Sequence, residues 1–219
     1  MSERSTTRER ILEVSRQLFN ERGYAATPVA EIAAKVGIAK GNLTYYFPAK
    51  LDLVAELAKR VRAELRDARA KNRSGPVADE YVDLVHAAMN HAWENRFLIR
   101  DQAQFRNDST PHAPDPDAAA DITTLGGLLK QMNTEAMFRK GLDLDLDALA
   151  RSLWIVSRYW IDHLHHAEGL HEVRWADQER GLRHHFAVLL PLLTAGARRE
   201  FESALERLAG THASRGNHA

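Results

Sequence analysis

Residues 27–47 read TPVAEIAAKVGIAKGNLTYYF, and this segment decides how the first part of the chain folds. Apolar residues recur at helical spacing on both sides of Gly37, so the segment predicts two short helices joined by a tight turn. Thr27 is a residue that caps free amides, and Pro28 suits the first helical position, which places the start of the first short helix here. The expected buried face comprises Ile32, Ala33, Val36, Ile38, Leu43 and Phe47.

The flanking sequence adds a helix before this pair. Residues 6–22 carry a stripe with helical period, and Gly23 is positioned to end that helix in a left-handed turn. Three helices, the last two short and joined through a glycine, match the helix-turn-helix arrangement whose final helix enters the major groove of DNA. The stripe expected to be buried comprises Ile11, Leu12, Ser15, Leu18 and Phe19.

The remainder of the chain also has helical spacing, and no alternating pattern with hairpin turns indicates a sheet. We therefore expect an all-α fold, with a three-helix head at residues 1–50 and a helical body at residues 51–209. The expected body helices cover 49–71, 77–100, 118–139, 146–168, 175–194 and 198–209, and Pro191 is expected to kink the fifth. The proline-rich segment 107–117 is expected to be an exposed connection, and the polar segment 210–219 a disordered tail.

Composition narrows the class of protein. The 219 residues are 44% hydrophobic and 27% charged, with a formal net charge of zero, which is typical of an ordinary globular protein. The absence of cysteine excludes disulfides, thiolate metal sites and cysteine nucleophiles. No signal peptide or membrane span is apparent, so we expect a cytoplasmic protein. The first fifty residues carry eight Lys/Arg against five acids, a mildly basic balance that suits contact with DNA.

The residues of the short helices resemble those of a known family. Residues 27–33 with Val36-Gly-Ile-Ala-Lys-Gly-Asn-Leu-Thr-Tyr-Tyr-Phe47 and the following Lys50 resemble the DNA-binding domain of the tetracycline-repressor (TetR) family of bacterial regulators, over roughly residues 6–55. The resemblance implies that Lys40 and Gly41 approach base edges, where guanine offers acceptors to the lysine. It further implies phosphate or backbone contacts from Thr27, Asn42, Thr44, Tyr45, Tyr46 and Lys50.

The chain departs from the usual family pattern at three positions. Ala39 replaces the common serine or threonine and gives up a helix cap worth about 1 kcal/mol. Thr44 stands where tyrosine is frequent, and Tyr46 where histidine is common. These departures weaken the expected phosphate contacts at residues 44 and 46, and Tyr46 could instead pack into the core.

The resemblance implies that the body forms a homodimer and encloses a pocket for a small-molecule effector of unknown identity. The candidate dimer contact joins the stripe from Leu153 to Trp160 with the stripe from Phe186 to Leu193; the alternative is that both stripes belong to the core of one chain. Aromatic side chains and methionines at helical spacing could form the pocket walls. The candidate pocket residues are Trp93, Phe97, Phe105, Met132, Met137, Trp154, Tyr159 and Trp160, with Arg158 and His163 as polar contacts.

Eleven histidines are many for this length, and they suggest an alternative function. His163 and His166 share a helical face within the cluster that also holds His165 and His171, so a metal sensor or a metal-dependent helical enzyme is conceivable. The segment lacks a His-Glu-x-x-His motif, and no other catalytic or cofactor-binding motif is present. The acidic segment 143–147 lacks the glycine and the glutamate of a calcium loop and is expected to cap a helix.

The function predicted from sequence is a non-enzymatic, ligand-responsive regulator without cofactor. We expect it to bind a palindromic operator in double-stranded DNA as a dimer and to act as a repressor. A helical adaptor whose head binds protein instead of DNA is a third hypothesis. Selection of binding sites from DNA distinguishes the adaptor from the regulator, because an adaptor enriches no DNA sequence.

Overall fold

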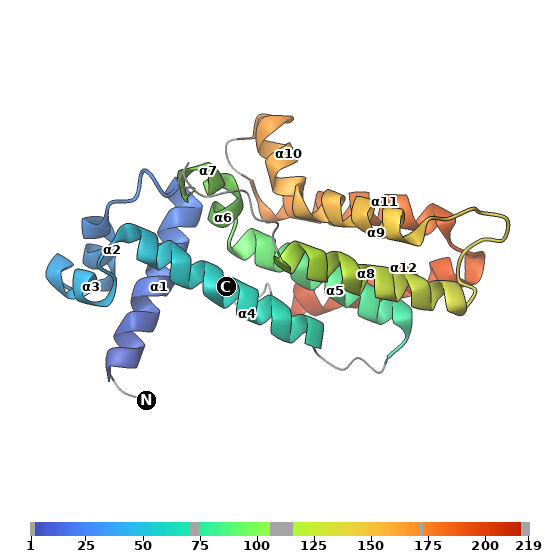
Figure 1. Cartoon of the computed structure of the whole chain (residues 1–219), viewed down its shortest axis with the longest axis horizontal. Coiled ribbons are helices and arrows are strands. Elements are labelled where there is room, and N and C mark those ends of the chain that lie inside the picture. Colours follow the sequence, from blue (N-terminus) through green and yellow to red (C-terminus); the bar gives the residue numbers. More distant parts are fainter. Residues whose placement is uncertain (1–2, 71–74, 106–115, 171–172, 216–219) are drawn as a thin grey trace. The chain divides into compact units, whose positions relative to one another are not determined.

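The protein, described here by a computed structural model, is helical throughout the residues that the structure describes, 3–70, 75–105, 116–170 and 173–215 (Figure 1). Within these residues the only β-type contact is an isolated antiparallel bridge between Phe138 and Leu193. The predicted all-α class is confirmed. The chain divides into two compact units, residues 1–66 with 91–113, and residues 67–90 with 114–219.

The first unit contains helices α1 (Glu3–Arg22), α2 (Val29–Val36) and α3 (Lys40–Tyr46), most of α4 (Lys50–Ala70), and the short helices α6 (Phe97–Arg100) and α7 (Gln102–Phe105). Helix α2 packs against both α1 and α3. The predicted stripe of α1 is buried from Ile11 to Phe19, including the hydroxyl of Ser15, which donates to the Ile11 carbonyl at 2.7 Å. The predicted core of the short helices is also buried, except Ile38, which is half-buried.

The turn between α2 and α3 forms as the sequence predicts, and the start of α2 does not. Gly37 adopts φ 79°, a left-handed conformation that glycine tolerates best. Pro28 is the N-cap residue of α2 rather than its first helical residue, and no side chain caps the helix. Thr27 is fully buried and its hydroxyl donates to the Gly23 carbonyl at 2.7 Å, so it anchors the chain to the end of α1 instead of capping α2.

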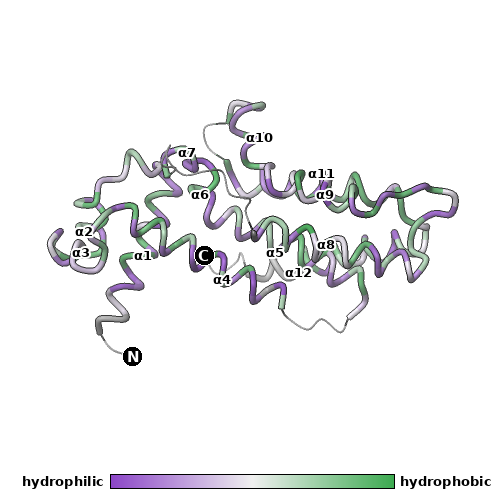
Figure 2. Tube along the Cα trace, viewed as in Figure 1, coloured by the Kyte–Doolittle hydropathy of each residue, from purple (hydrophilic) through white to green (hydrophobic). Residues whose placement is uncertain are grey.

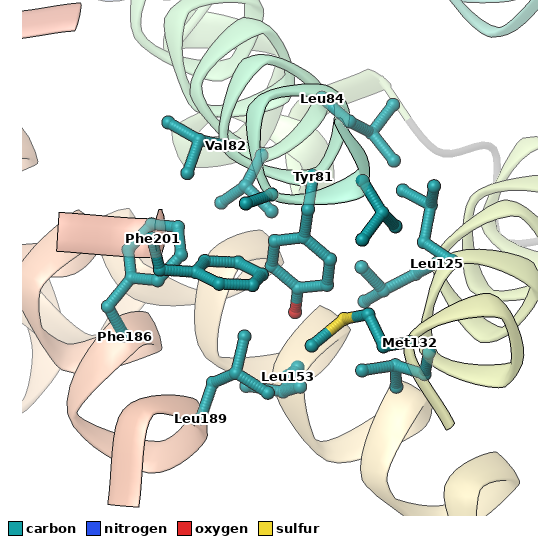
Figure 3. Close-up of a cluster of buried hydrophobic side chains, with 14 of the residues drawn as sticks. Tyr81, Val82, Leu84, Leu125, Met132, Leu153, Phe186, Leu189 and Phe201 are labelled. Carbon is teal, nitrogen blue, oxygen red and sulfur yellow. The ribbon is translucent and has the colours of Figure 1, made fainter. Parts of the chain in front are cut away.

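The second unit contains most of α5 (Val77–Glu94), followed by α8 (Pro116–Thr134), α9 (Leu146–Arg158), α10 (Trp160–His166), α11 (Trp175–Leu189), the 3₁₀ turn η1 (Leu190–Leu192) and α12 (Ala195–Arg215). Helix α9 packs against α8, α10 and α11. The Tyr81 ring projects from α5 into a core formed with Met132, Leu153 and Phe201 (Figure 3). Close packing of these side chains makes the unit a single hydrophobic core.

A line of polar groups crosses this apolar core. His185 is fully buried, and its Nε2 lies 2.9 Å from the Tyr81 hydroxyl while its Nδ1 lies 2.8 Å from Ser157 Oγ. Burial lowers the pKa of His185 to about 4, so the imidazole is neutral at pH 7. With the Tyr81 hydroxyl donating to Nε2, the Nδ1–H donates to Ser157, whose own hydroxyl donates to the Leu153 carbonyl at 3.2 Å.

Several helix ends differ from the prediction. The helix expected over 146–168 is interrupted at Tyr159, and the one expected over 77–100 ends at Glu94 before α6 begins. Pro191 does not kink a continuous helix: α11 ends at Leu189, and Pro191 lies in the 3₁₀ turn that follows it. Helix α12 continues to Arg215, into the segment expected to be a tail, and the expected connection at 107–117 lies largely outside the described residues.

Hydrophilic and hydrophobic positions alternate along the long helices, including α4, α8 and α11 (Figure 2). None of the helices within the described ranges is both long enough and apolar enough to span a bilayer.

Candidate nucleic-acid interface

Helix α3 presents a short row of polar groups to solvent. It begins after Ala39, and its first three residues, Lys40, Gly41 and Asn42, are all exposed. A Cβ built on Gly41 would meet no atom within 4 Å, so the space in front of the helix is open. Leu43 on the opposite side is fully buried and fixes the helix to the core of the unit. The N-terminal end of α3 can therefore approach another surface closely.

The last turn of α3 carries the aromatic residues of the predicted interface. Tyr45 is 73% exposed, the most exposed large hydrophobic side chain among the described residues, whereas Tyr46 is half-buried and packs on the core. The two rings meet edge to face with centroids 5.6 Å apart. The Thr44 hydroxyl donates back to the Gly41 carbonyl at 3.0 Å, which leaves its oxygen able to accept. Tyr45 is thus the freer of the two tyrosines to reach a phosphate.

Two of the expected phosphate ligands are engaged inside the unit. Thr27 is buried, as described above, so its side chain is not available to DNA. The Lys50 ammonium donates to the Tyr24 carbonyl and lies 4.2 Å from the centroid of the Tyr24 ring. Burial lowers the pKa of Lys50, and the nearby Asp101 carboxylate opposes that shift. The half-buried Lys50 therefore makes contacts within the first unit, through the carbonyl and the ring of Tyr24.

The sequence did not predict a polar cluster at the C-terminal end of α1. The Arg100 guanidinium donates to the carbonyls of Phe19 and Asn20, at 2.6 and 3.1 Å. Asp101 is 4% exposed, and its carboxylate accepts from the Tyr24 amide at 2.8 Å as well as from Arg100. These side chains cap the free groups at the helix end.

Asn20 completes this cluster from the α1 side. Its Nδ2 donates to the Glu94 carbonyl at 2.7 Å and its Oδ1 accepts from the Phe97 amide at 3.1 Å. No sequence pattern described above indicated these contacts. Periodicity cannot reveal them, because they join residues about eighty positions apart.

The candidate effector residues do not form one group. Phe97 is fully buried in the core of the first unit, against Phe19 with centroids 5.3 Å apart, and Phe105 packs on Tyr24 at 4.9 Å. Both therefore belong to the core of the first unit and not to a pocket in the body. Trp93 also belongs to the first unit, where Arg96 lies over its ring.

The remaining candidates lie in the second unit. Trp160 is buried and stacks on the exposed His163, with centroids 5.2 Å apart, and its indole donates to the Asp177 carbonyl at 2.7 Å. Trp154 contacts Tyr159 edge to face, and Arg158 lies over that tyrosine. One guanidinium nitrogen of Arg158 is buried without a hydrogen-bond partner. Met132 and Met137 are core residues.

The histidines are dispersed among separate partners. His163 lies 3.3 Å from Glu168, the Nδ1 of His165 is 2.7 Å from the Leu170 carbonyl, and the Nδ1 of His166 is 3.0 Å from the Asp162 carbonyl. His171 lies outside the described residues. Within the described ranges, no three potential ligands from His, Asp and Glu are grouped to hold a metal ion. The metal-dependent alternative is not favoured.

A helix-turn-helix with an exposed polar recognition helix, followed by a helical body, defines the class of DNA-binding transcription regulators. Comparison with known proteins agrees. Residues 11–57 match the model of bacterial regulatory proteins of the tetR family, and residues 58–201 match that of a bacterial transcriptional repressor. The chain therefore belongs to the TetR family.

Among similar curated proteins, the chain is 29% identical over 157 residues to the transcriptional repressor KstR of Rhodococcus jostii, covering 72% of this chain and 70% of that protein. It is 36% identical over 55 residues to the regulator AcrR of Shigella flexneri, covering 25% of this chain and 26% of that protein. A TetR-family regulator from Marinobacter aquaeolei shares the fold with a TM-score of 0.74 at 20% identity, covering 94% of this chain and 98% of that one.

Proposed function

We propose that this protein is a repressor that binds a palindromic operator as a homodimer, with one α3 helix in each of two successive major grooves. The observation that carries the proposal is the exposed row at the start of α3, where Lys40, Gly41 and Asn42 stand on a buried apolar support. Lys40 reads guanine, and Gly41 lets the helix sit deep in the groove. Contacts to the sugar–phosphate backbone of the DNA come from Asn42, Thr44, Tyr45 and Tyr46. Repression is supported by the named activity of the Rhodococcus relative.

The proposed dimer contact is the exposed face of α9 and α11, two helices that pack against one another. Ile155, Tyr159 and Val188 are 47%, 49% and 42% exposed, which is unusual for large apolar side chains. Of the residues predicted for this contact from sequence, five are buried in the core of their own unit, Leu153, Trp160, Phe186, Leu189 and Leu193, and four are half-buried, Trp154, Val156, Ser157 and Leu190. The proposed contact is therefore centred on the exposed Ile155 of α9 and Val188 of α11, with Tyr159 directly after α9.

The effector is proposed to act on the second unit, in the cytoplasm, near Trp154, Arg158, Trp160 and His163. The unpartnered nitrogen of Arg158 supports this location, because a buried donor without an acceptor is costly unless a ligand supplies one. Release of DNA requires that the effector bind the two states with different affinity.

Selection of binding sites from a random duplex pool tests the DNA-binding proposal. The full chain is expected to enrich an inverted repeat, and Lys40→Ala is expected to weaken binding to that site about tenfold while relaxing preference at one base pair of each half-site. Lys59→Ala makes the same charge change at an exposed position of α4 and is the matched control. Failure to enrich any sequence, or equal behaviour of the two variants, would contradict the proposal.

A further inference from the structure

A groove of about 560 Å³ lies within the first unit, between α1 and α4 and beside the end of α5. Leu12 and Leu57, both buried, and the half-buried Val61 provide an apolar floor. The volume is in the range of pockets that hold small organic molecules. The DNA-binding role of α3 makes no use of this groove, since its lining residues come from other helices.

Two of the arginines that line the groove are neutralised internally. Arg60 binds both carboxylate oxygens of Glu9, joining α4 to α1, and Arg16 binds both oxygens of Glu13. The third nitrogen of Arg16 donates to the Glu94 carbonyl at 2.7 Å. Hydrogen bonding to these arginines lowers the pKa of Glu9 and of Glu13, so both pairs are ionised at pH 7. Both guanidinium charges are therefore compensated by a carboxylate within the unit.

The groups left over in the lining are mostly acceptors. The Glu64 carboxylate lies 3.5 Å from His91 Nδ1, and the Glu94 carboxylate has no ion-pair partner among the described residues. Arg10 is the one remaining guanidinium, so the lining holds one more carboxylate than guanidinium. An excess of negative charge beside an apolar floor favours a cation with an apolar portion.

Asn95 gives an independent indication of the same ligand chemistry. It lines the groove although it is only 6% exposed, and its Nδ2 donates to the His91 carbonyl at 3.1 Å. That bond fixes the orientation of the amide, because the flipped amide would place Oδ1 of Asn95 against the His91 carbonyl oxygen. Its Oδ1 then accepts from no donor within the part of the chain that the structure describes. Although the residue as a whole is buried, this oxygen keeps some solvent exposure and is available to accept from an N–H donor.

We propose that this groove is a binding site for a small protonated amine with an apolar body, separate from the effector site of the second unit. The ammonium group donates to Asn95 Oδ1 and is attracted by Glu64 and Glu94, while the apolar body covers Leu12, Leu57 and Val61. Because the ligand contacts both α1 and α4, its binding stabilises the first unit.

Calorimetric titration of the full-length protein with n-hexylamine, 1-hexanol and hexanoate tests whether binding requires a positively charged ligand. The three probes share a six-carbon alkyl chain and differ in the charge of the head group. We expect saturable binding of the amine at one site per chain, at least about tenfold tighter than either other probe. Equal binding of hexanol would overturn the proposed role of the ammonium group. Absence of saturable amine binding in the millimolar range would overturn the site itself.

Three variants locate the binding. Glu64→Gln combined with Glu94→Gln is expected to weaken amine binding about tenfold or more, whereas Glu206→Gln, an exposed carboxylate of α12, leaves it unchanged. Val61→Phe fills the groove and is expected to abolish binding. Circular dichroism establishes that each variant is folded, and amide NMR shifts in the wild type should concentrate at the groove residues of α1 and α4. Unchanged affinity in the double variant or in Val61→Phe would contradict the assignment.

Discussion

Lys40 and Lys50 lie in one short segment, but their side chains have different surroundings. Lys40 stands exposed at the first turn of α3, whereas the Lys50 ammonium donates to the Tyr24 carbonyl and lies over the Tyr24 ring. The resemblance implied DNA contact for both, because a motif assigns residues by position in the sequence. The difference arises from burial and from a nearby carboxylate, Asp101, which lies far away in the sequence.

For Lys50→Ala we expect a loss of about 1 kcal/mol in the free energy of unfolding, because one hydrogen bond and one cation–π contact disappear. The slope of log affinity against log salt for operator DNA should remain as in the wild type, because no phosphate contact is removed. Denaturant unfolding and binding measured over a salt series check both parts. A slope reduced by about one unit would show that Lys50 neutralises a phosphate after all.

His185 makes the stability of the second unit depend on pH. Its pKa in the folded protein is about 4, and a histidine in an unfolded chain has a pKa of about 6.5. Between these values the unfolded chain binds a proton that the folded chain does not, so the free energy of unfolding falls as the pH falls. We expect a loss of about 2 kcal/mol from this group between about pH 7.5 and about pH 5.

Urea unfolding at several pH values measures this effect. His185→Gln is expected to remove most of the dependence between pH 5 and 7, while His184→Gln, a substitution at the exposed neighbour, keeps it. Identical pH profiles for the wild type and His185→Gln would show that the buried imidazole is not the cause.

Helix interiors could be predicted from the sequence, and several helix ends could not. The stripe of α1 and the turn at Gly37 follow local rules of period and conformation, and both are as expected. The break at Tyr159 follows no such rule. The Trp160 indole beside it donates to the Asp177 carbonyl, a contact with α11 that periodicity does not encode. Asp145, in contrast, caps α9 by accepting from the Ala148 amide at 2.9 Å, as the acidic segment predicted.

Helix α3 begins without a side-chain cap. Ala39 holds the N-cap position with φ −65° and ψ 145°, the extended conformation in which a serine hydroxyl can accept from the amides of the first turn. Ala39→Ser is therefore expected to raise the free energy of unfolding by about 1 kcal/mol. Ala34→Ser, at an exposed position inside α2, is the matched control and should be slightly destabilising. Thermal melting or urea unfolding decides; no gain from Ala39→Ser would contradict the capping argument.

For the whole molecule, the sequence predicted the helical class from periodicity along the chain and the family from a short contiguous motif. It did not predict which residues belong to which unit. Phe97 and Phe105 follow the first body helix in sequence but pack with Phe19 and Tyr24 in the first unit. The candidate effector set was consequently divided between the units, since aromatic composition alone does not report packing partners.

The proposed dimer makes a prediction at the same scale. A chain of 24.7 kDa should sediment with twice that mass, and Ile155→Arg should shift it to the monomer, because a charge would be buried at the contact. The monomer should also bind a full operator much more weakly, since one half-site is lost. Leu142→Arg places the same charge at another exposed apolar position and should leave the dimer intact. Monomeric wild type would contradict the proposal.

The capping of α1 by Arg100 and Asp101 also bears on the order in which the protein is made. During synthesis the three helices of the DNA-binding motif leave the ribosome well before residue 101, yet the carbonyls of Phe19 and Asn20 and the Tyr24 amide receive these partners only from that residue and its neighbour. The nascent motif therefore lacks its final hydrogen bonds until part of the body has been translated. A newly made chain cannot complete the capping of α1 ahead of the segment that follows α5.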